Sequence, residues 1–207
     1  GALAAASAVS APPAEGNVGA GTGASVGKMF GMTLAMKSGL GTASMDIGGG
    51  VIVGAIVAVN AWGDIINPKT GEIVAGLRSG KVGPLRVGGK DPAFANTLAM
   101  MKSPIGRGVL GLTSRGNTVI GAVATNAKLT KAQATKVAQM AQDGFARCIL
   151  PAHTILDGDV IFALSTGTKK ADVSTIGAFA AEVMAEAILR AVKSAKEAGG
   201  LPGLNKT

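Results

Sequence analysis

The chain has 207 residues, of which 47% are hydrophobic, 15% are charged and 32 are glycine. This length and composition suit one folded domain, and they exclude a disordered chain and a charge-rich helical bundle. The formal net charge of +8 is spread evenly, with no concentrated basic block. Because the chain also lacks tyrosine and has few other aromatic residues to stack on bases, we expect no nucleic-acid partner.

The cysteine content and the hydropathy pattern bear on the compartment. A single cysteine, Cys148, excludes an internal disulfide and is typical of a reducing compartment. Its apolar neighbours Ile149 and Leu150 predict that it is a small core residue. No apolar run is long enough to cross a bilayer, so no membrane partner is expected. We expect a cytoplasmic protein, with the periplasm as the alternative.

The first elements surround a glycine-rich loop. Residues 2–11 favour a short helix that Pro12 and Pro13 stop. Residues 15–28 are rich in glycine and end in Lys28, but no Ser or Thr follows the lysine as a phosphate loop requires. The loop is therefore interpreted as structural or substrate-lining. Lys28 either reaches solvent or holds its ammonium group near a reacting group.

Two strands and a hairpin are predicted next. Residues 38–46 and 51–60 have strand character, and the second is hydrophobic enough to be central in a sheet. Residues 62–72 carry a hairpin signature. Asn60 stands where the central strand ends. It is either a turn residue or an amide N–H donor to a developing oxyanion.

Residues 76–116 predict a long loop that contains a short helical patch over residues 92–102. A loop of this length in a compact domain is usually functional or mobile. We expect it to act as a flap that brings the Asn117–Thr118 bond into a site and tolerates a break afterwards.

From Thr118 onward the pattern predicts a β-α-β-α arrangement. Strands are expected over residues 119–125 and 160–165, and helices over residues 131–147 and 174–198. Thr130 is the expected N-cap of the first of these helices. The second helix is expected to bury one apolar face on the sheet, through Ile176, Val183, Met184, Ala187 and Ile188. The tail from residue 199 onward is expected to fray.

The dipeptide Asn117–Thr118 is the strongest candidate for chemistry. A turn supplied by Gly116 and Asn117 places Thr118 at the first strand position, where its hydroxyl faces a cleft. If the bond before Thr118 is cut, the threonine has both a hydroxyl nucleophile and a free α-amine to serve as its base. The alternative is that the pair simply opens a strand.

Asp157 and Asp159 precede the next strand with one residue between them. Period-two alternation would place both carboxylates on one face, where they repel each other unless a cation or a proton lies between them. Lys28 or the Thr118 ammonium group would satisfy the pair. A turn cap is the alternative, and a metal site is not expected because no further His or carboxylate ligand is assembled. The single His153 is predicted to form a structural hydrogen bond, with a place in the cleft as the alternative.

Three separated parts of the chain together resemble the L-aminopeptidase/D-esterase family of self-cleaving hydrolases. These parts are residues 15–28 with 38–44, residues 116–120 with 124–126, and residues 157–166. Their order and spacing are also similar to the nylon-oligomer hydrolase branch of that family. The resemblance implies an αββα sandwich of the N-terminal-nucleophile type and a precursor that cuts itself. It also implies hydrolysis of amide bonds in peptides, D-amino-acid amides or esters, β-peptides or 6-aminohexanoate oligomers, and we expect no cofactor.

Carried onto this chain, the resemblance makes Thr118 the nucleophile that cleavage after Asn117 exposes. Lys28, Asn60 and the two aspartates, Asp157 and Asp159, match the polar site of the nylon-oligomer branch. In that branch the carboxylate pair stands where the aminopeptidase branch has a serine and a glutamate. This match favours the nylon-oligomer branch without fixing the substrate.

The resemblance also implies how the chain is divided. Residues 1–117 correspond to the C-terminal part of the family's α-fragment and residues 118–207 to its β-fragment, together one domain. Family precursors carry a further segment before the part that begins at Gly1, and that segment supplies sheet strands. If neighbouring subunits cover the sheet in its place, the protein is a homo-oligomer, expected to be a tetramer or larger.

Two other functions stay open at this stage. A self-cleaving acyltransferase of the ornithine-acetyltransferase type would also use a threonine but would pass the acyl group to an amine. A non-catalytic assembly module would instead use the glycine-rich loops and the last helix for contacts between subunits.

Overall fold

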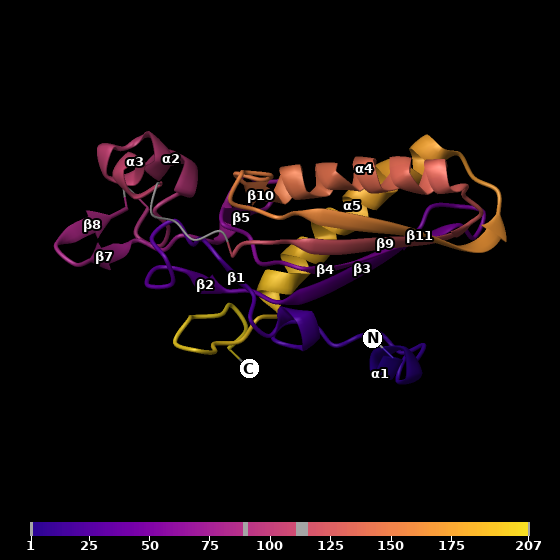
Figure 1. Cartoon of the computed structure of the whole chain (residues 1–207), viewed down its shortest axis with the longest axis horizontal. Coiled ribbons are helices and arrows are strands. Elements are labelled where there is room, and N and C mark those ends of the chain that lie inside the picture. Colours follow the sequence, from indigo (N-terminus) through magenta and orange to yellow (C-terminus); the bar gives the residue numbers. More distant parts are fainter. Residues whose placement is uncertain (1, 89–90, 111–115, 207) are drawn as a thin grey trace.

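The computed structural model describes residues 2–88, 91–110 and 116–206, and its centre is a four-stranded sheet (Figure 1). The strand order is β11 (Val160–Lys169), β9 (Ile120–Ala127), β4 (Ile52–Ala58) and β3 (Leu40–Asp46). Strands β3, β4 and β9 pair antiparallel, and β11 pairs parallel to β9. The start of β9 therefore lies beside the start of β11 and the end of β4.

Two long helices pack against each other on one face of this sheet. Helix α5 (Val173–Lys193) lies against β3 and β4, and helix α4 (Lys131–Cys148) lies against β11. Alternate residues of β4 face them and are buried, as the period-two pattern of a half-covered strand requires. The predicted apolar face of α5 is buried on the sheet at every position named above.

Close approach of α5 to the sheet depends on a glycine. A Cβ atom on Gly41 would collide with the backbone of Ala187 and Ala191 in α5. Gly41 pairs across the sheet with Val57, and Val57 pairs with Gly121, so this row runs under the helix. Small residues in the row let the helix backbone lie directly on the strands.

The opposite face of the sheet carries exposed apolar side chains. They share the other set of alternate strand positions and are Ile52, Ile56, Ile120, Phe162 and Leu164, exposed by 38–58%. Among the described residues no long helix packs on this face, and contiguous apolar side chains exposed in this way often mark a contact with other protein.

Most of the remaining short elements gather beyond the end of the sheet where β9 begins, whereas α1 lies apart from them, below the sheet in this view (Figure 1). Three small sheets join β1 (Ser25–Val26) to β2 (Met36–Lys37), β7 (Gly80–Val82) to β8 (Leu85–Val87), and β10 (Ile149–Leu150) to β5 (Asp64–Ile66) and β6 (Ile73–Ala75). Within the described residues, the helical pieces besides α4 and α5 are α1 (Ala2–Ala6), the 3-10 turn η1 (Gly19–Gly21), α2 (Thr97–Lys102) and α3 (Pro104–Leu110).

A buried carboxylate ties several of these elements together. Asp64 in β5 is 2% exposed, and it accepts hydrogen bonds from the amides of Leu77 and Thr97 at 2.7 and 2.6 Å. The Thr97 hydroxyl donates a third, at 2.8 Å. Burial raises the pKa of Asp64, against these three donors, which lower it. A buried acid is tolerated here because its oxygens have partners.

Most predicted elements are confirmed. The strands on both sides of Gly48–Gly50, the hairpin after Asn60 and the β-α-β-α order after Thr118 are all present, and β4 lies inside the sheet. Thr130 caps α4, and its capping box with Gln133 is complete. Cys148 is a buried core residue, and burial raises the pKa of its thiol to about 12.

Three expectations about the extent of segments are wrong. Helix α1 ends at Ala6 rather than Ala11, where Ser7 turns its amide and hydroxyl onto the Leu3 carbonyl. The region 76–116 is not one long loop, since it contains β7, β8, α2 and α3, while residues 89–90 and 111–115 lie outside the described part. Helix α5 stops at Lys193 rather than Ala198.

The tail after residue 199 was also expected to fray, but as far as residue 206 it is bound to the domain. The Lys37 amide donates to the Pro202 carbonyl at 2.9 Å, and the Asn205 amide donates to the Ala195 carbonyl at 2.9 Å. Gly199 and Gly200, both at positive φ, form the turn that brings the tail back. None of the helices in the described ranges is both long and apolar enough to cross a membrane.

The close contact at Gly41 predicts a stability difference between two glycines of the same sheet. Gly41→Ala should lower the free energy of unfolding by about 1–3 kcal/mol, because its methyl group must push backbone apart. Gly54→Ala is the matched control, since its Cβ would meet its nearest atoms at an ordinary 3.6 Å. Urea denaturation measures both, and equal stability of the two variants would contradict the packing described.

Candidate active site

The Asn117–Thr118 bond lies at the end of the sheet where three segments meet. Asn117 is 1% exposed and forms a parallel bridge with Asp157, and the Thr118 amide donates to the Asn60 carbonyl at 3.1 Å. The bond is therefore held between the residue that follows β4 and the loop that leads into β11.

The carbonyl oxygen of Asn117 accepts two hydrogen bonds, one from the Thr118 hydroxyl group and one from a backbone amide. Thr118 Oγ1 donates to this carbonyl oxygen at 2.7 Å, and the Gly158 amide donates to it at 2.8 Å. An amide fixed on a carbonyl oxygen is a donor that would stabilise negative charge developing there. A Cβ atom at Gly158 would lie 2.8 Å from Thr118 Oγ1, so glycine also leaves room for the hydroxyl group.

Lys28 and Asn60 form the second part of the site. Lys28 Nζ donates to Asn60 Oδ1 at 2.7 Å and to the Asn60 carbonyl at 3.0 Å. The Asn60 side-chain amide donates to the Gly116 carbonyl at 3.2 Å, one residue before the Asn117 carbonyl. Lys28 thus orients Asn60, and Asn60 contacts the backbone on the N-terminal side of the candidate bond.

The glycine-rich loop positions Lys28. Gly27 has φ of +71°, and a Cβ atom there would collide with the backbone of Gly76 and Leu77. The amides of Gly27 and Lys28 donate to the carbonyls of Gly63 and Trp62, both at 2.9 Å. The loop is therefore a backbone support for the lysine, in agreement with its interpretation as structural.

The environment of Lys28 weakens its hold on a proton. The side chain is buried, and burial lowers its pKa from 10.5 to about 8, while the negative charge of Asp157 acts in the opposite direction. A lysine with this pKa exchanges its proton near neutral pH, which suits a proton carrier.

The two aspartates are held by different partners. Asp157 accepts from the Trp62 amide at 3.0 Å and from the Thr154 hydroxyl at 2.6 Å. Asp159 accepts from the Val119 amide at 3.1 Å. Burial raises the pKa of Asp159, and the charge of Asp157 adds to that rise.

The expectation that strand alternation places Asp157 and Asp159 on one face is wrong. Strand β11 begins at Val160, so both residues precede the regular strand and their placement does not come from its alternation. The loop before the strand, its hydrogen bonds and the bridge to Asn117 bring the carboxyl groups close enough to interact. Loop conformation of this kind is not visible in a period-two pattern.

The predicted residues are thus brought together: Lys28 and Asn60 by direct hydrogen bonds, Thr118 by its bond to the Asn60 carbonyl, and the aspartates through charge. Sequence reasoning missed the Gly158 amide, because the direction of a backbone donor carries no residue-type signal. Within the described ranges, no group of His, Cys, Asp or Glu residues could hold a metal ion.

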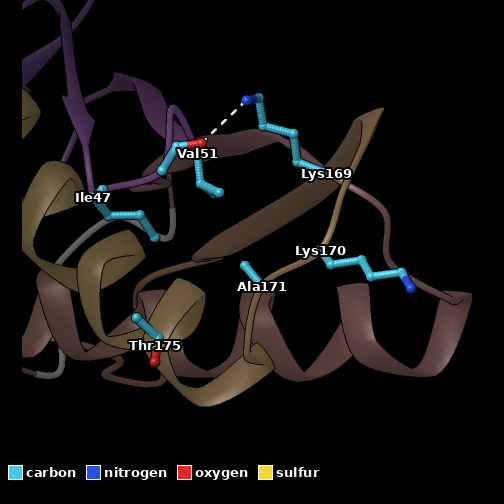
Figure 2. A pocket seen from close by; sticks show the side chains of 8 residues that line it. Ile47, Val51, Lys169, Lys170, Ala171 and Thr175 are labelled. Atoms are coloured by element: carbon cyan, nitrogen blue, oxygen red, sulfur yellow. Dashed lines mark hydrogen bonds between the residues drawn. The ribbon is translucent and has the colours of Figure 1, made fainter.

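A separate pocket lies at the other end of the sheet, where β11 ends and β4 begins (Figure 2). Ile47, Val51 and the stem of Lys169 line it, and Lys169 Nζ donates to the Gly49 carbonyl at 3.1 Å. Its position excludes it from the chemistry of Thr118, because the two lie at opposite ends of the same strands.

Comparison with known proteins gives the family. The model of peptidase family S58 matches residues 1–205. The chain belongs to this family. The predicted resemblance to the L-aminopeptidase/D-esterase family is thereby confirmed, because the S58 family includes the L-aminopeptidase D-Ala-esterase described below.

Two relatives show the range of names within the family. An uncharacterized aminopeptidase of Mycobacterium leprae is 38% identical over 209 residues, which cover 91% of this chain and 51% of the relative. A 6-aminohexanoate-oligomer endohydrolase of Paenarthrobacter ureafaciens is 31% identical over 192 residues, which cover 86% of this chain and 51% of the relative. The chain thus spans about half the length of these relatives.

Solved structures confirm the fold class. A beta-aminopeptidase of Burkholderia sp. matches with a TM-score of 0.60 and 26% identity, over 99% of this chain and 54% of that one. The L-aminopeptidase D-Ala-esterase/amidase of Ochrobactrum anthropi matches with a TM-score of 0.60 and 22% identity, over 94% and 48%. The second is described as a variant of the Ntn hydrolase fold, the class to which the predicted αββα sandwich belongs. The part of the chain that the structure describes forms one helix layer, α4 and α5, on one four-stranded sheet.

The lowered pKa of Lys28 predicts a pH-dependent stability. Between about pH 8 and pH 10.5 the folded lysine has lost its proton while the unfolded one keeps it, so the free energy of unfolding rises with pH. Compared with Lys28→Met, the wild type should gain up to about 3 kcal/mol across this window. Chemical denaturation at several pH values measures this difference. A difference that falls with pH would contradict the burial of a charged lysine.

Proposed function

We propose that the protein is a self-processing amide-bond hydrolase whose nucleophile is Thr118, exposed by cleavage after Asn117. The observation that carries the proposal is the shared contact on the Asn117 carbonyl, where Thr118 Oγ1 lies at 2.7 Å and the Gly158 amide at 2.8 Å. Membership in peptidase family S58 and the names of the aminopeptidase and endohydrolase relatives support it.

In maturation, Thr118 Oγ1 attacks the carbonyl carbon of Asn117, and the hydroxyl proton passes through Lys28 to the leaving Thr118 nitrogen. The Gly158 amide stabilises the oxyanion. The resulting N→O acyl shift gives an ester between Asn117 and the threonine side chain. Water hydrolyses this ester, which leaves a carboxylate on Asn117 and a free amine on Thr118.

In turnover, the free amine of Thr118 accepts the hydroxyl proton while Oγ1 attacks the substrate amide. Its ordinary pKa of roughly 7.7–8.0 makes an α-amine a usable base at neutral pH. The Gly158 and Asn60 amides stabilise the oxyanion, and Lys28 with the carboxylates of Asp157 and Asp159 orients the amine. The proton then moves to the leaving amine, and water releases the acyl group. No step requires a cofactor.

The substrate class we propose is a peptide or a small amide. The relatives are named for aminopeptidase, beta-aminopeptidase and 6-aminohexanoate-oligomer activities, all of which cleave amide bonds. The carboxylate pair Asp157/Asp159 favours the nylon-oligomer branch. Acyl transfer of the ornithine-acetyltransferase type is separated from hydrolysis by adding an amine acceptor, since a transferase forms the acylated amine.

A homo-oligomer, a tetramer or larger, stays a prediction. It is supported by the exposed apolar face of the sheet, with Ile56, Ile120 and Phe162 among its residues. A non-catalytic assembly module, which would use the glycine-rich loops and the last helix for subunit contacts, would leave the chain uncut.

The first prediction of the proposal concerns the mass of the full-length protein. The wild type should contain a species that begins at Thr118, and Thr118→Ala should lack it, because alanine has no nucleophile. Thr118→Ser is the matched control and should still be cut, since it keeps the hydroxyl group. Intact-mass measurement detects all three. An uncut wild type, or a cut Thr118→Ala variant, would exclude Thr118 as the nucleophile.

A second prediction concerns the effect of a side chain at position 158 on the rate of self-cleavage. Gly158→Ala should slow self-cleavage by about 100-fold or more, because its methyl group displaces Thr118 Oγ1 and shifts the amide on the Asn117 carbonyl. Gly116→Ala is the matched control near the same bond, since a Cβ there meets nothing within 4 Å. Time courses of intact mass compare the two, and equal rates would remove Gly158 from the mechanism.

A further inference from the structure

His153 occupies a constrained position beside the candidate site. Its φ is +54°, a left-handed conformation uncommon for residues other than glycine. Its ring stacks on Phe145 of α4, with ring centroids 5.9 Å apart and planes at 26°. Helix α4 thus contacts the imidazole from one side, and the left-handed backbone turns it toward Asp159, which lies later in the same loop.

The other side of the imidazole faces Asp159. Nδ1 lies 3.1 Å from Asp159 Oδ2, and the His153 amide donates to the same oxygen at 3.4 Å. The second oxygen of the carboxyl group, Oδ1, accepts from the Val119 amide. The His153 side chain is 40% exposed and that of Asp159 is 4% exposed. A half-exposed imidazole is therefore connected through a buried carboxyl group to the amide that follows Thr118.

We propose that His153 is a positioning residue of this site, which orients Asp159 so that its carboxylate holds the Val119 amide and faces the nucleophile end of β9. The proposal rests on the function proposed above. It extends that function to a residue outside the five site residues identified in the sequence.

The charges around Asp159 explain why a partner is needed. Burial and the negative charge of Asp157 raise the pKa of Asp159, whereas the Val119 amide and His153 lower it. Lys28, on the turn after β1, interacts with Asp157, and α4 contributes the uncharged Phe145. Removal of the imidazole leaves Asp159 beside the negative charge of Asp157 with one side-chain partner fewer. Asp159 should then bind a proton at a higher pH.

A purely structural role is the alternative, because His153 also supports the loop through its stacking and its backbone conformation. Two variants separate the roles. His153→Phe keeps a ring for Phe145 but has no side-chain nitrogen near Asp159. His153→Asn loses the ring, tolerates positive φ and keeps an N–H donor. Ile155→Ala is the matched control in the same loop, since Ile155 is 95% exposed.

The first measurement is the rate of self-cleavage between about pH 5 and about pH 8, followed by intact mass of the full-length protein. His153→Phe should move the acid limb of the profile to higher pH by about one unit, which lowers the rate on that limb about tenfold. His153→Asn should move it less, and Ile155→Ala should leave it unchanged. A wild-type profile in His153→Phe, or an equal shift in Ile155→Ala, would overturn the proposal.

The second measurement does not depend on catalysis. In the uncut Thr118→Ala background, carbon-13 NMR of the aspartate carboxyl groups should report a higher pKa for Asp159 when His153 is replaced by Phe. An unchanged titration would overturn the role of His153 even if Thr118 proves to be the nucleophile. A raised pKa would uphold that role even if the wild type is not cut at Thr118.

Discussion

Pairing of β9 with both of its neighbours at one end of the sheet is the constraint on which the site depends. The Thr118 amide bonds to the Asn60 carbonyl after β4, and the Gly158 amide bonds to the Asn117 carbonyl from the loop before β11. These two hydrogen bonds flank one peptide bond and fix its plane. Since the strands are held by α4 and α5, packing far from Thr118 determines where its hydroxyl group lies.

The charged residues around this bond are costly to bury, and their arrangement offsets the cost. Lys28, Asp157 and Asp159 each have hydrogen-bond or charge partners within the loops that meet there. Burial lowers the pKa of Lys28 and raises that of Asp159, so both groups move toward neutral pH. Such shifts are characteristic of catalytic sites, where proton exchange near pH 7 is useful. Burial of these groups thus lowers the stability of the fold, and the same burial shifts their pKa values toward the range that proton transfer needs.

Much of the fold could be predicted from the sequence because its signals are local. The capping box at Thr130, the apolar face of α5 and the triple glycine between β3 and β4 each specify structure within a few residues. The bound tail was missed, since the carbonyl of Pro202 meets the amide of Lys37 far away in the chain. Helix α3 was missed because its two glycines lower helix propensity.

The site could be predicted from the sequence less completely than the fold. Residue types and their order pointed to Lys28, Asn60, Thr118 and the two aspartates, whereas the backbone donor on the Asn117 carbonyl could not be predicted. A backbone amide such as that of Gly158 carries no residue-type signal, and its direction depends on the bridge between Asn117 and Asp157. The position of the imidazole of His153 against Asp159 similarly needs the positive φ and the ring of Phe145.

The most direct test of Thr118 as a self-exposed nucleophile is the concentration dependence of cleavage. Uncut full-length protein, obtained under denaturing conditions and refolded, would be sampled over time by intact mass at two concentrations. An intramolecular attack predicts that the fragment beginning at Thr118 appears with the same first-order rate constant at both. A rate constant that rises with concentration, or a refolded chain that stays uncut, would contradict it.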